Sequence, residues 1–489
     1  MTIETEPTLL KYRRTKIVAT LGPASSEERV IEQLIQAGVD VFRFNMSHGD
    51  HESHRLVYER VQRCSARKGR RLTAVLFDLS GPKIRVGTFP NGRIPLIQGR
   101  EVTVTTREVA GEEALIPSQY AALANDVSSG DRILLDDGAL ELEVVSVDGT
   151  EVRCKVTSGG ILKNHKGMNL PGVDLSAPSL TDKDKRDAEL ALELGADFLA
   201  LSFVRRASDV DDLRELVDES GKRVQIVSKI ERPEALDDID AIIERSDAIM
   251  VARGDLGVEL PPQTVPLVQS QLIDLARSRA KPVIVATQML ESMMYQSRPT
   301  RAEVSDVAYA VRSGADAVML SGESAAGKYP VAAVAMMDTI ARQTEAYLWH
   351  QAAFGGLTAG TTAMSATVPP IAVEDALGRS TAQLSRDLRV RTILVISQSG
   401  RTAAVMSSFR PAAPIVTASS DPSTCRMASL LWGVIPAVVE TTALHDSRGL
   451  ARRLARELDF GSEGQKLLVV RGFGSDPNRD TPSITVVTI

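Results

Sequence analysis

Eight short apolar runs recur between residues 15 and 323, and most are separated by segments with the spacing of amphipathic helices. The runs cover residues 15–22, 39–47, 72–79, 198–204, 224–230, 248–254, 282–288 and 317–323. Strands that alternate with helices form parallel sheets, and eight such units are typical of a (β/α)8 barrel. We therefore predict an α/β fold built on a TIM barrel.

The third and fourth runs are separated by a long segment of different character. Residues 87–175 are rich in glycine and alternate apolar with polar residues, as strands with one buried face do. We predict that they form a small β-barrel domain inserted after the third strand of the barrel. An insertion at that point lies over the active face and can serve as a lid.

The chain after the eighth run is predicted to form a separate α/β regulatory domain. A stretch of small residues at 351–370 reads as a linker, and further apolar runs cover 391–397, 413–419, 433–440, 466–472 and 483–489. The predicted organisation is therefore barrel (1–86 and 176–350), inserted domain (87–175), linker (351–370) and carboxy-terminal domain (371–489).

Charge and cysteine content exclude several classes of protein. The formal net charge of −6 leaves no basic surplus for nucleic acid or an anionic membrane. Three cysteines without a CxxC spacing argue against a disulfide framework and a thiolate zinc site. The amino terminus does not resemble a secretory signal, and no apolar run approaches the ~20 residues of a membrane span. We expect a cytoplasmic protein.

One lysine and two carboxylates interrupt the apolar pattern. Lys229 and Glu231 stand two residues apart at the end of the fifth run, so their side chains point the same way. Asp255 follows the sixth run. A lysine with two carboxylates at neighbouring strand ends is what a metal-assisted phosphate or enolate site requires. An ordinary ion pair that caps the sheet is the alternative.

Other polar residues also fall at the carboxyl ends of the predicted strands, where barrels of this kind carry their working residues. They are Arg43, Asn45 and Ser47 after the second run, Asp78, Lys83 and Arg85 after the third, Thr287 after the seventh, and Ser321 and Glu323 after the eighth. His48, His51 and His54 recur every third residue. We interpret His51 and His54 as part of a solvated helix turn capped by Asp50 rather than as a metal cluster.

The motifs at these positions resemble those of the pyruvate kinase family, in order and spacing, across about residues 13–345. They read TKIVATLGPAS, FRFNMSHGD, FDLSGPKIRVG, NLPG, SFVRRASDV, SKIERPEAL, IMVARGDLGVE, VATQMLESM and LSGESAAGKYP. The carboxy-terminal domain is similar more loosely, through ISQSGRTA. The resemblance implies phosphoryl transfer between phosphoenolpyruvate and ADP, giving pyruvate and ATP.

The resemblance also implies a role for each site residue. Lys229, Thr287 and Arg43 would be catalytic, and substrate would contact them together with Gly254 and Asp255. Glu231 and Asp255 would hold Mg²⁺, with Mn²⁺ as a possible substitute. The implied nucleotide contacts are Asn45, Ser47, His48, Arg85 and Arg206.

The chain departs from the family between residues 79 and 83. Most members read Asp-Thr-Lys-Gly-Pro-Glu here and need K⁺, bound through residues that match Asn45, Ser47 and Asp78. This chain has lysine at position 83, where the family has glutamate. A fixed ammonium group could take the place of the ion, which predicts that K⁺ is not required. A surface exchange without consequence is the alternative.

A possible effector loop lies in the carboxy-terminal domain. Ser397, Ser399, Gly400, Arg401 and Thr402 follow a predicted strand and open a helix, an arrangement that can cradle a phosphate. A simple capping turn is the alternative. In the family this loop binds a phosphorylated effector, and the members are usually homotetramers, so we expect both.

Two other functions are alternatives to a kinase. A catalytically silent, metabolite-sensing protein on the same fold should have lost Lys229, Glu231, Asp255 or Thr287, and none is lost. Another barrel enzyme of enolpyruvate chemistry, such as a metal-dependent lyase, would not need Arg43, Arg85 and an inserted lid together.

Overall fold

The computed structural model describes residues 9–67, 72–359, 370–472 and 482–489. The predicted barrel is confirmed: eight parallel strands close in the order β1-β16-β15-β14-β13-β12-β3-β2. Each strand lies within its predicted apolar run. The strands are β1 (Lys16–Thr20), β2 (Val41–Asn45), β3 (Ala74–Asp78), β12 (Phe198–Leu201), β13 (Gln225–Ile230), β14 (Ala248–Ala252), β15 (Val283–Ala286) and β16 (Ala317–Leu320).

Helices surround this barrel and bury the outward faces of the strands in one continuous core, while a second core fills the barrel interior. Thr181 and Thr300 begin their helices with capping boxes. The helices are α1 (Glu28–Ala37), α2 (His51–Ser65), α4 (Asp182–Leu194), α5 (Ala207–Glu219), α6 (Glu234–Asp237), α7 (Ile239–Arg245), α8 (Arg253–Glu259), α9 (Val265–Ser278), α10 (Arg301–Arg312), α11 (Gly322–Ala325) and α12 (Pro330–Ala352), with a 3-10 turn at Glu291–Met294.

The inserted domain lies between β3 and α4 and has its own apolar core. Its strands form a six-stranded sheet, β11-β7-β8-β9-β5-β6, and a two-stranded sheet, β10-β4. The segment at Arg85 and Val86 bridges to Gly167 beside β11 and to Ser118 beside β6, so it joins the two edges of the larger sheet. The elements are β4 (Arg93–Leu96), β5 (Glu101–Thr105), β6 (Leu115–Pro117), α3 (Leu123–Asp126), β7 (Arg132–Leu135), β8 (Leu140–Asp148), β9 (Glu151–Ser158), β10 (Gly160–Lys163) and β11 (Met168–Asn169).

The carboxy-terminal domain is an α/β unit with a five-stranded sheet in the order β19-β18-β17-β20-β21, in which β21 is antiparallel. All five predicted strands are present. The elements are α15 (Val373–Asp387), β17 (Ile393–Ile396), α16 (Arg401–Ser408), β18 (Ile415–Ser419), α17 (Pro422–Ala428), β19 (Val434–Val438), α18 (Ser447–Glu457), β20 (Lys466–Arg471) and β21 (Ser483–Thr488).

The predicted linker at 351–370 begins within ordered structure, because α12 continues to Ala352 and α13 (Gly356–Ala359) follows. Its remaining residues, 360–369, lie outside the described part of the chain. The domain boundaries given above stay predictions.

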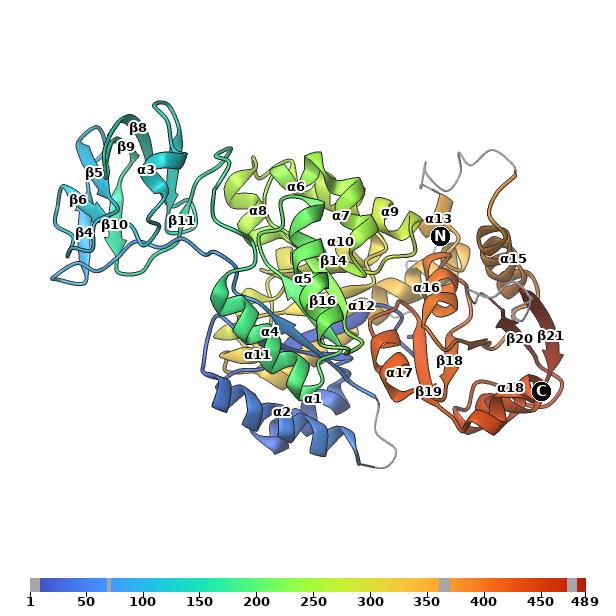
Figure 1. Ribbon diagram of the computed structural model, residues 1–489. Coiled ribbons are helices and arrows are strands. Elements are labelled where there is room, and N and C mark those ends of the chain that lie inside the picture. The colour runs from blue at the N-terminus through green and yellow to red at the C-terminus, as the bar shows by residue number, and fades with distance from the viewer. Residues whose placement is uncertain (1–8, 68–71, 360–369, 473–481) are drawn as a thin grey trace.

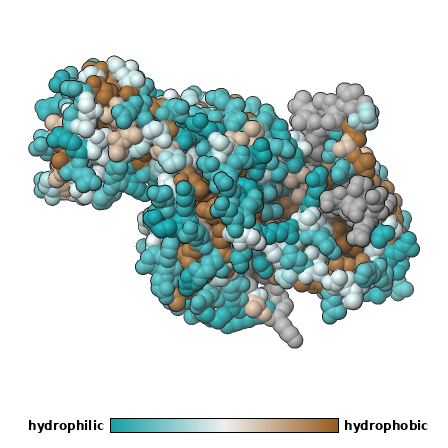
Figure 2. All heavy atoms as spheres, viewed as in Figure 1, coloured by the Kyte–Doolittle hydropathy of each residue, from teal (hydrophilic) through white to brown (hydrophobic). Residues whose placement is uncertain are grey.

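The barrel lies between the other two domains (Figure 1). The inserted domain projects at one end, and the carboxy-terminal domain packs on the barrel at the other. A buried ion pair crosses the second junction, with Arg410 Nη1 2.9 Å from Asp316 Oδ1. The face drawn in Figure 2 is mostly hydrophilic over the barrel helices. Among the described residues, we find no helix with both the length and the apolar character of a membrane span.

Candidate active site

A cavity of about 140 Å³ opens at the carboxyl ends of the barrel strands and gathers most of the predicted site residues. Arg43 and Asp78 come from β2 and β3, Lys229 comes from β13, and Thr287 follows β15. The other predicted residues in its lining are Asn45, Ser47, His48, Lys83, Arg85, Glu231, Asp255 and Ser321. The cavity therefore brings together side chains that lie far apart in the sequence, from Arg43 to Ser321.

The ammonium group of Lys229 lies at the centre of a charged network. Its Nζ is 3.0 Å from Glu231 Oε1 and 3.2 Å from Asp78 Oδ1, and it donates to Ser202 Oγ at 2.7 Å. Burial alone would lower the pKa of Lys229, but Asp78 and Glu231 outweigh that effect and raise it. The ammonium therefore stays charged.

Asp78 connects Lys229 to Arg43. Arg43 Nε donates to Asp78 Oδ2 at 2.6 Å, and its Nη1 donates to Thr20 Oγ1 at 3.0 Å. Burial would raise the pKa of Asp78, but the two cations outweigh it and lower the pKa below its ordinary value. The Asp78 carboxylate therefore fixes the positions of both the Arg43 guanidinium and the Lys229 ammonium.

Glu231 and Asp255 fit a divalent cation. Glu231 is buried and accepts a hydrogen bond from the backbone N–H of Phe203 at 2.7 Å. Burial raises the pKa of Glu231 to about 7, Lys229 opposes that rise, and Asp255 adds to it. Lys229 offsets only part of the negative charge of Glu231 and Asp255, and a divalent cation would neutralise the remainder. Mg²⁺ commonly takes one or two protein carboxylates and completes its shell with water and substrate oxygens.

A larger protein-only metal cluster is absent from the described residues: no group of three or more His, Cys, Asp or Glu side chains converges. The predicted cap of α2 by Asp50 is present. His51 contacts Asp187 and His54 contacts the carbonyl of His48, while Asp50 caps α2 with a capping box.

Thr287 sits in a strained turn after β15. Its φ is 68° and that of Gln288 is 54°, both in the left-handed region that disfavours residues with a side chain. The Thr287 hydroxyl donates to the carbonyl of Ala286 at 2.6 Å and accepts from the N–H of Gly254 at 2.8 Å. The Gly254 N–H is therefore bonded to Thr287, and its predicted contact with substrate stays a prediction.

Arg253 fixes this turn. Its guanidinium donates to the carbonyls of Thr287 at 2.7 Å and Ala286 at 3.3 Å, and Nη1 pairs with Asp306 at 2.6 Å. Sequence reasoning missed Arg253, Ser202 and Lys183, which bonds to the carbonyl of Met46 and to Asp187. Each lies inside a motif quoted above or at a helix start, but nothing in the pattern distinguishes it from a surface charge or a cap.

Two predicted residues lie elsewhere. The guanidinium of Arg206 is 3.5 Å from Asp174 and does not line the cavity. Glu323 is buried and accepts from the backbone N–H groups of Leu290 and Ser321, so it holds two loops together. Arg85 lines the cavity and donates to the carbonyl of His165 at 3.0 Å.

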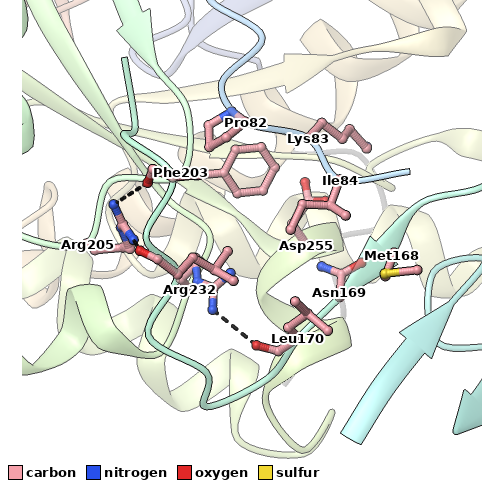
Figure 3. A pocket seen from close by; sticks show the side chains of 12 residues that line it. Pro82, Lys83, Ile84, Met168, Asn169, Leu170, Phe203, Arg205, Arg232 and Asp255 are labelled. Atoms are coloured by element: carbon pink, nitrogen blue, oxygen red, sulfur yellow. Dashed lines mark hydrogen bonds between the residues drawn. The ribbon is translucent and has the colours of Figure 1, made fainter. Parts of the chain in front are cut away.

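Lys83 lies at the junction of the barrel and the inserted domain, where Figure 3 shows it near Asp255. Arg232 donates there to the carbonyls of Leu170 and Val173, both at 3.2 Å. Lys83 itself is exposed and lines the cavity with Asp78, but its ammonium forms no ion pair with a residue that the structure describes.

The predicted effector loop precedes α16. Gly400 has a φ of 87° and its N–H donates to Ser397 Oγ at 3.0 Å. Arg223, two residues before β13, donates to the carbonyl of Ser399 at 2.6 Å and to Thr424 Oγ1 at 2.8 Å. The loop is therefore tied to the barrel strand that carries Lys229. Arg401 is largely exposed, 3.8 Å from Glu374, and Thr402 is buried.

Comparisons with known proteins show the family of this chain. The family model for the pyruvate kinase barrel domain matches residues 12–334, and that for the pyruvate kinase alpha/beta domain matches residues 375–487. The chain belongs to the pyruvate kinase family. A curated pyruvate kinase of Staphylococcus saprophyticus is 46% identical over 88% of this chain and 72% of its own length.

Two further pyruvate kinases match over nearly their whole length. The one from Mycobacterium intracellulare is 42% identical over 95% of this chain and 96% of its own. A solved structure of a pyruvate kinase from Cryptosporidium parvum superposes with a TM-score of 0.89 at 33% identity, covering 97% of this chain and 96% of that one. The predicted fold and enzyme class, a phosphotransferase of glycolysis, are thereby confirmed, and a catalytically silent protein is not favoured. Pyruvate kinases generally need a divalent metal ion.

Proposed function

We propose that this chain transfers the phosphoryl group of phosphoenolpyruvate to ADP, with a proton, to give pyruvate and ATP. One observation carries the proposal. The Lys229 ammonium lies between Asp78 and Glu231 in a cavity that also contains Arg43, Asp255 and Thr287. Cations and carboxylates at one strand-end cavity are what phosphoryl transfer needs.

Charge neutralisation is the main task of this site. The transferred group passes through a loose transition state with charge on its oxygens, so alignment and cations matter more than covalent help. Arg43 can bind the phosphoryl group bidentately, and Lys229 would neutralise the enolate oxygen. Glu231 and Asp255 would hold Mg²⁺, or Mn²⁺ in its place, which when bound supplies further charge neutralisation.

The proton that completes pyruvate goes to the enolate carbon. Thr287 is a weak acid, and its hydrogen is committed to the Ala286 carbonyl. We assign it the orientation of a water molecule that delivers the proton. Asn45, Ser47, His48 and Arg85 would contact the nucleotide, and Arg206 would do so only if its contact with Asp174 opened.

A coupled assay with phosphoenolpyruvate, ADP and Mg²⁺ tests the proposal. We expect pyruvate and ATP to form in equal amounts and only when all three are present. Release of inorganic phosphate without ATP, or no turnover by folded protein, would contradict it.

We also propose that K⁺ is not required, because Lys83 places a cation on the cavity that contains Asn45, Ser47 and Asp78. The wild-type chain should be fully active in buffer without K⁺. The Lys83→Glu variant should lose activity there and regain at least about tenfold on adding K⁺, since the ion replaces the missing charge. Strong activation of the wild-type chain by K⁺ would refute the idea.

Two regulatory proposals rest on the family. A phosphorylated effector would bind at Ser397, Ser399, Gly400, Arg401 and Thr402, and Arg401→Ala should abolish activation by such compounds.

The chain would form a homotetramer, which light scattering of the purified protein can measure. A monomer at micromolar concentration would contradict that assignment.

A further inference from the structure

A second cavity, of about 730 Å³, opens at the opposite end of the barrel. Arg14 precedes β1, so this cavity lies at the amino-terminal ends of the strands, whereas the candidate active site lies at their carboxyl ends. The barrel contributes the end of α12, and the carboxy-terminal domain contributes the end of α15, the chain that follows it and the turn before β18. A volume of this size suits a small-molecule ligand.

Positive charge dominates the lining. The charged Lys, Arg, Asp and Glu side chains in it are Lys11, Arg14, Arg386, Arg389, Arg391 and Asp459. Asp459 is already paired with Lys11 at 2.5 Å. Within the described ranges of the chain, none of the four arginines forms an ion pair. The cavity therefore presents guanidinium groups without the anions that normally accompany them.

Arg14 is the strongest of these observations. It is only 5% exposed, and its Nε has no hydrogen-bond partner among the residues described. Its Nη2 reaches only a backbone carbonyl, that of Ala412 at 3.2 Å. Burial lowers the pKa of Arg14 to about 10, against the opposing effect of Glu345. A buried, incompletely bonded guanidinium is costly unless a ligand satisfies it.

Arg386 repeats the pattern on the other wall. Its Nη1 is buried and has no partner in the described part of the chain, while Nη2 donates to Gln383 at 3.0 Å. Apart from His350, Gln351 and Ser385, the remaining lining is apolar or aromatic. Tyr12 and Phe460 pack with their ring centroids 4.9 Å apart, and Trp349 is 40% exposed at the rim.

We propose that this cavity binds a small phosphorylated metabolite, with its phosphate toward Arg14 and Arg386 and its remaining part against the aromatic side chains. A phosphate dianion has enough oxygens to satisfy several guanidinium groups at once. Such a ligand would join the barrel to the carboxy-terminal domain, because both contribute to the cavity. The site is separate from the loop at residues 397–402 and does not depend on the proposed reaction.

Tryptophan fluorescence of the full chain tests this proposal. The chain has two tryptophans, Trp349 at the cavity and Trp432 in the core. Ribose 5-phosphate is the probe, with ribose and inorganic phosphate as comparators at constant ionic strength. We expect a saturable emission change with ribose 5-phosphate that ribose does not produce and that disappears in Trp349→Phe. A response to inorganic phosphate alone would show that the phosphate group suffices.

The double variant Arg386→Gln/Arg389→Gln removes two positive charges from the lining of the cavity. We expect its apparent dissociation constant to rise at least about tenfold, since charge-assisted hydrogen bonds are lost. Arg153→Gln/Arg312→Gln, which removes two exposed charges elsewhere, should bind as the wild-type chain does. Arg386→Gln alone, at the side chain assigned to the phosphate, serves if the double variant does not fold.

Three outcomes would overturn the proposal: no saturable change, unaltered binding by the folded Arg386/Arg389 variant, or loss of the response in Arg401→Gln alone. The last result would place the ligand at the effector loop. None of these measurements requires catalysis, so a failure here is distinct from a failure of the proposed kinase reaction.

Discussion

At the scale of single residues, the site is a balance of buried charges. Asp78 is held by two cations, Arg43 and Lys229, whereas Glu231 shares Lys229 and faces Asp255. The pKa values follow this difference: that of Asp78 falls and that of Glu231 rises. The position with the surplus negative charge is the one where a divalent cation fits.

Two substitutions of Lys229 distinguish the effect of its charge from the effect of its exact position. Lys229→Gln should lower kcat by about 10²–10³, because a charge aimed at the developing enolate is lost. Lys229→Arg keeps the charge but not the point-like ammonium, so it should unfold near the wild-type temperature and still turn over slowly. Kinetics and thermal unfolding of both variants check this. If Lys229→Arg has the kcat of the wild-type chain, the exact position of the positive charge is unimportant, which would contradict this prediction.

Protonation of Glu231 should weaken metal binding. Because burial raises the pKa of Glu231 to about 7, its protonated fraction grows as the pH falls through neutrality. A metal ion needs the carboxylate, so the apparent dissociation constant for Mn²⁺ should rise up to about tenfold between pH 7 and pH 6. Calorimetric titration measures it. Glu231→Gln should bind weakly without that slope, and a flat wild-type profile would contradict the assignment.

At the scale of elements, the turn after β15 is strained, and contacts from the start of α8 hold it in place. The turn after β15 keeps two residues in the left-handed region, at roughly 1–3 kcal/mol each. Arg253 at the start of α8 bonds to that turn, and the Gly254 N–H reaches Thr287 from the same helix. The ends of β14 and β15 are thus locked together.

Weakening the contacts of Arg253 with the turn after β15 should lower kcat more than it changes KM. In Arg253→Lys the ammonium cannot reach both carbonyls and Asp306, so Thr287 should shift. We expect kcat to fall about 10- to 100-fold with KM changed less than about threefold. Asp306→Asn leaves the bonds to the turn in place and should have a milder effect. Steady-state kinetics at saturating ADP decide, and an unchanged kcat in Arg253→Lys would rule out this role.

The sequence predicts the strands and the charged residues at their ends, but not the contacts that position those residues. The eight barrel strands and five carboxy-terminal strands follow from apolar runs, and Lys229, Glu231 and Asp255 stand out because charges there break the pattern. Ser202, Lys183 and Arg253 were missed, since their partners are backbone atoms or residues far along the chain. The bond from Gly254 to Thr287 depends on a backbone turn that residue spacing does not encode.

At the scale of the whole molecule, buried contacts join the barrel to the carboxy-terminal domain. Arg410 pairs with Asp316, donates to the carbonyl of Gly314 at 2.7 Å, and lies over the ring of Trp432, 5.0 Å from its centroid. The cavity lined by Arg14 and the loop tied to Arg223 adjoin the same junction. Ligands there would act on how the two domains meet.

Removing Arg410 should therefore destabilise the molecule strongly. Arg410→Met leaves the Asp316 carboxylate buried without its cation, at a cost of about 3–5 kcal/mol. Urea unfolding should show a lower midpoint. Arg410→Met/Asp316→Asn should lose less than the two single variants together, because the unpaired charge is also removed. Strictly additive losses would argue against a coupled pair.

The place of the inserted domain has a consequence for modularity. β3 pairs directly with β12, although residues 87–175 come between them in the chain. The barrel therefore closes without any strand of the inserted domain. A short turn in place of residues 87–175 should leave a barrel that still folds. Such a shortened chain would keep all eight barrel strands, so the inserted domain should be exchangeable without redesign of the rest of the molecule.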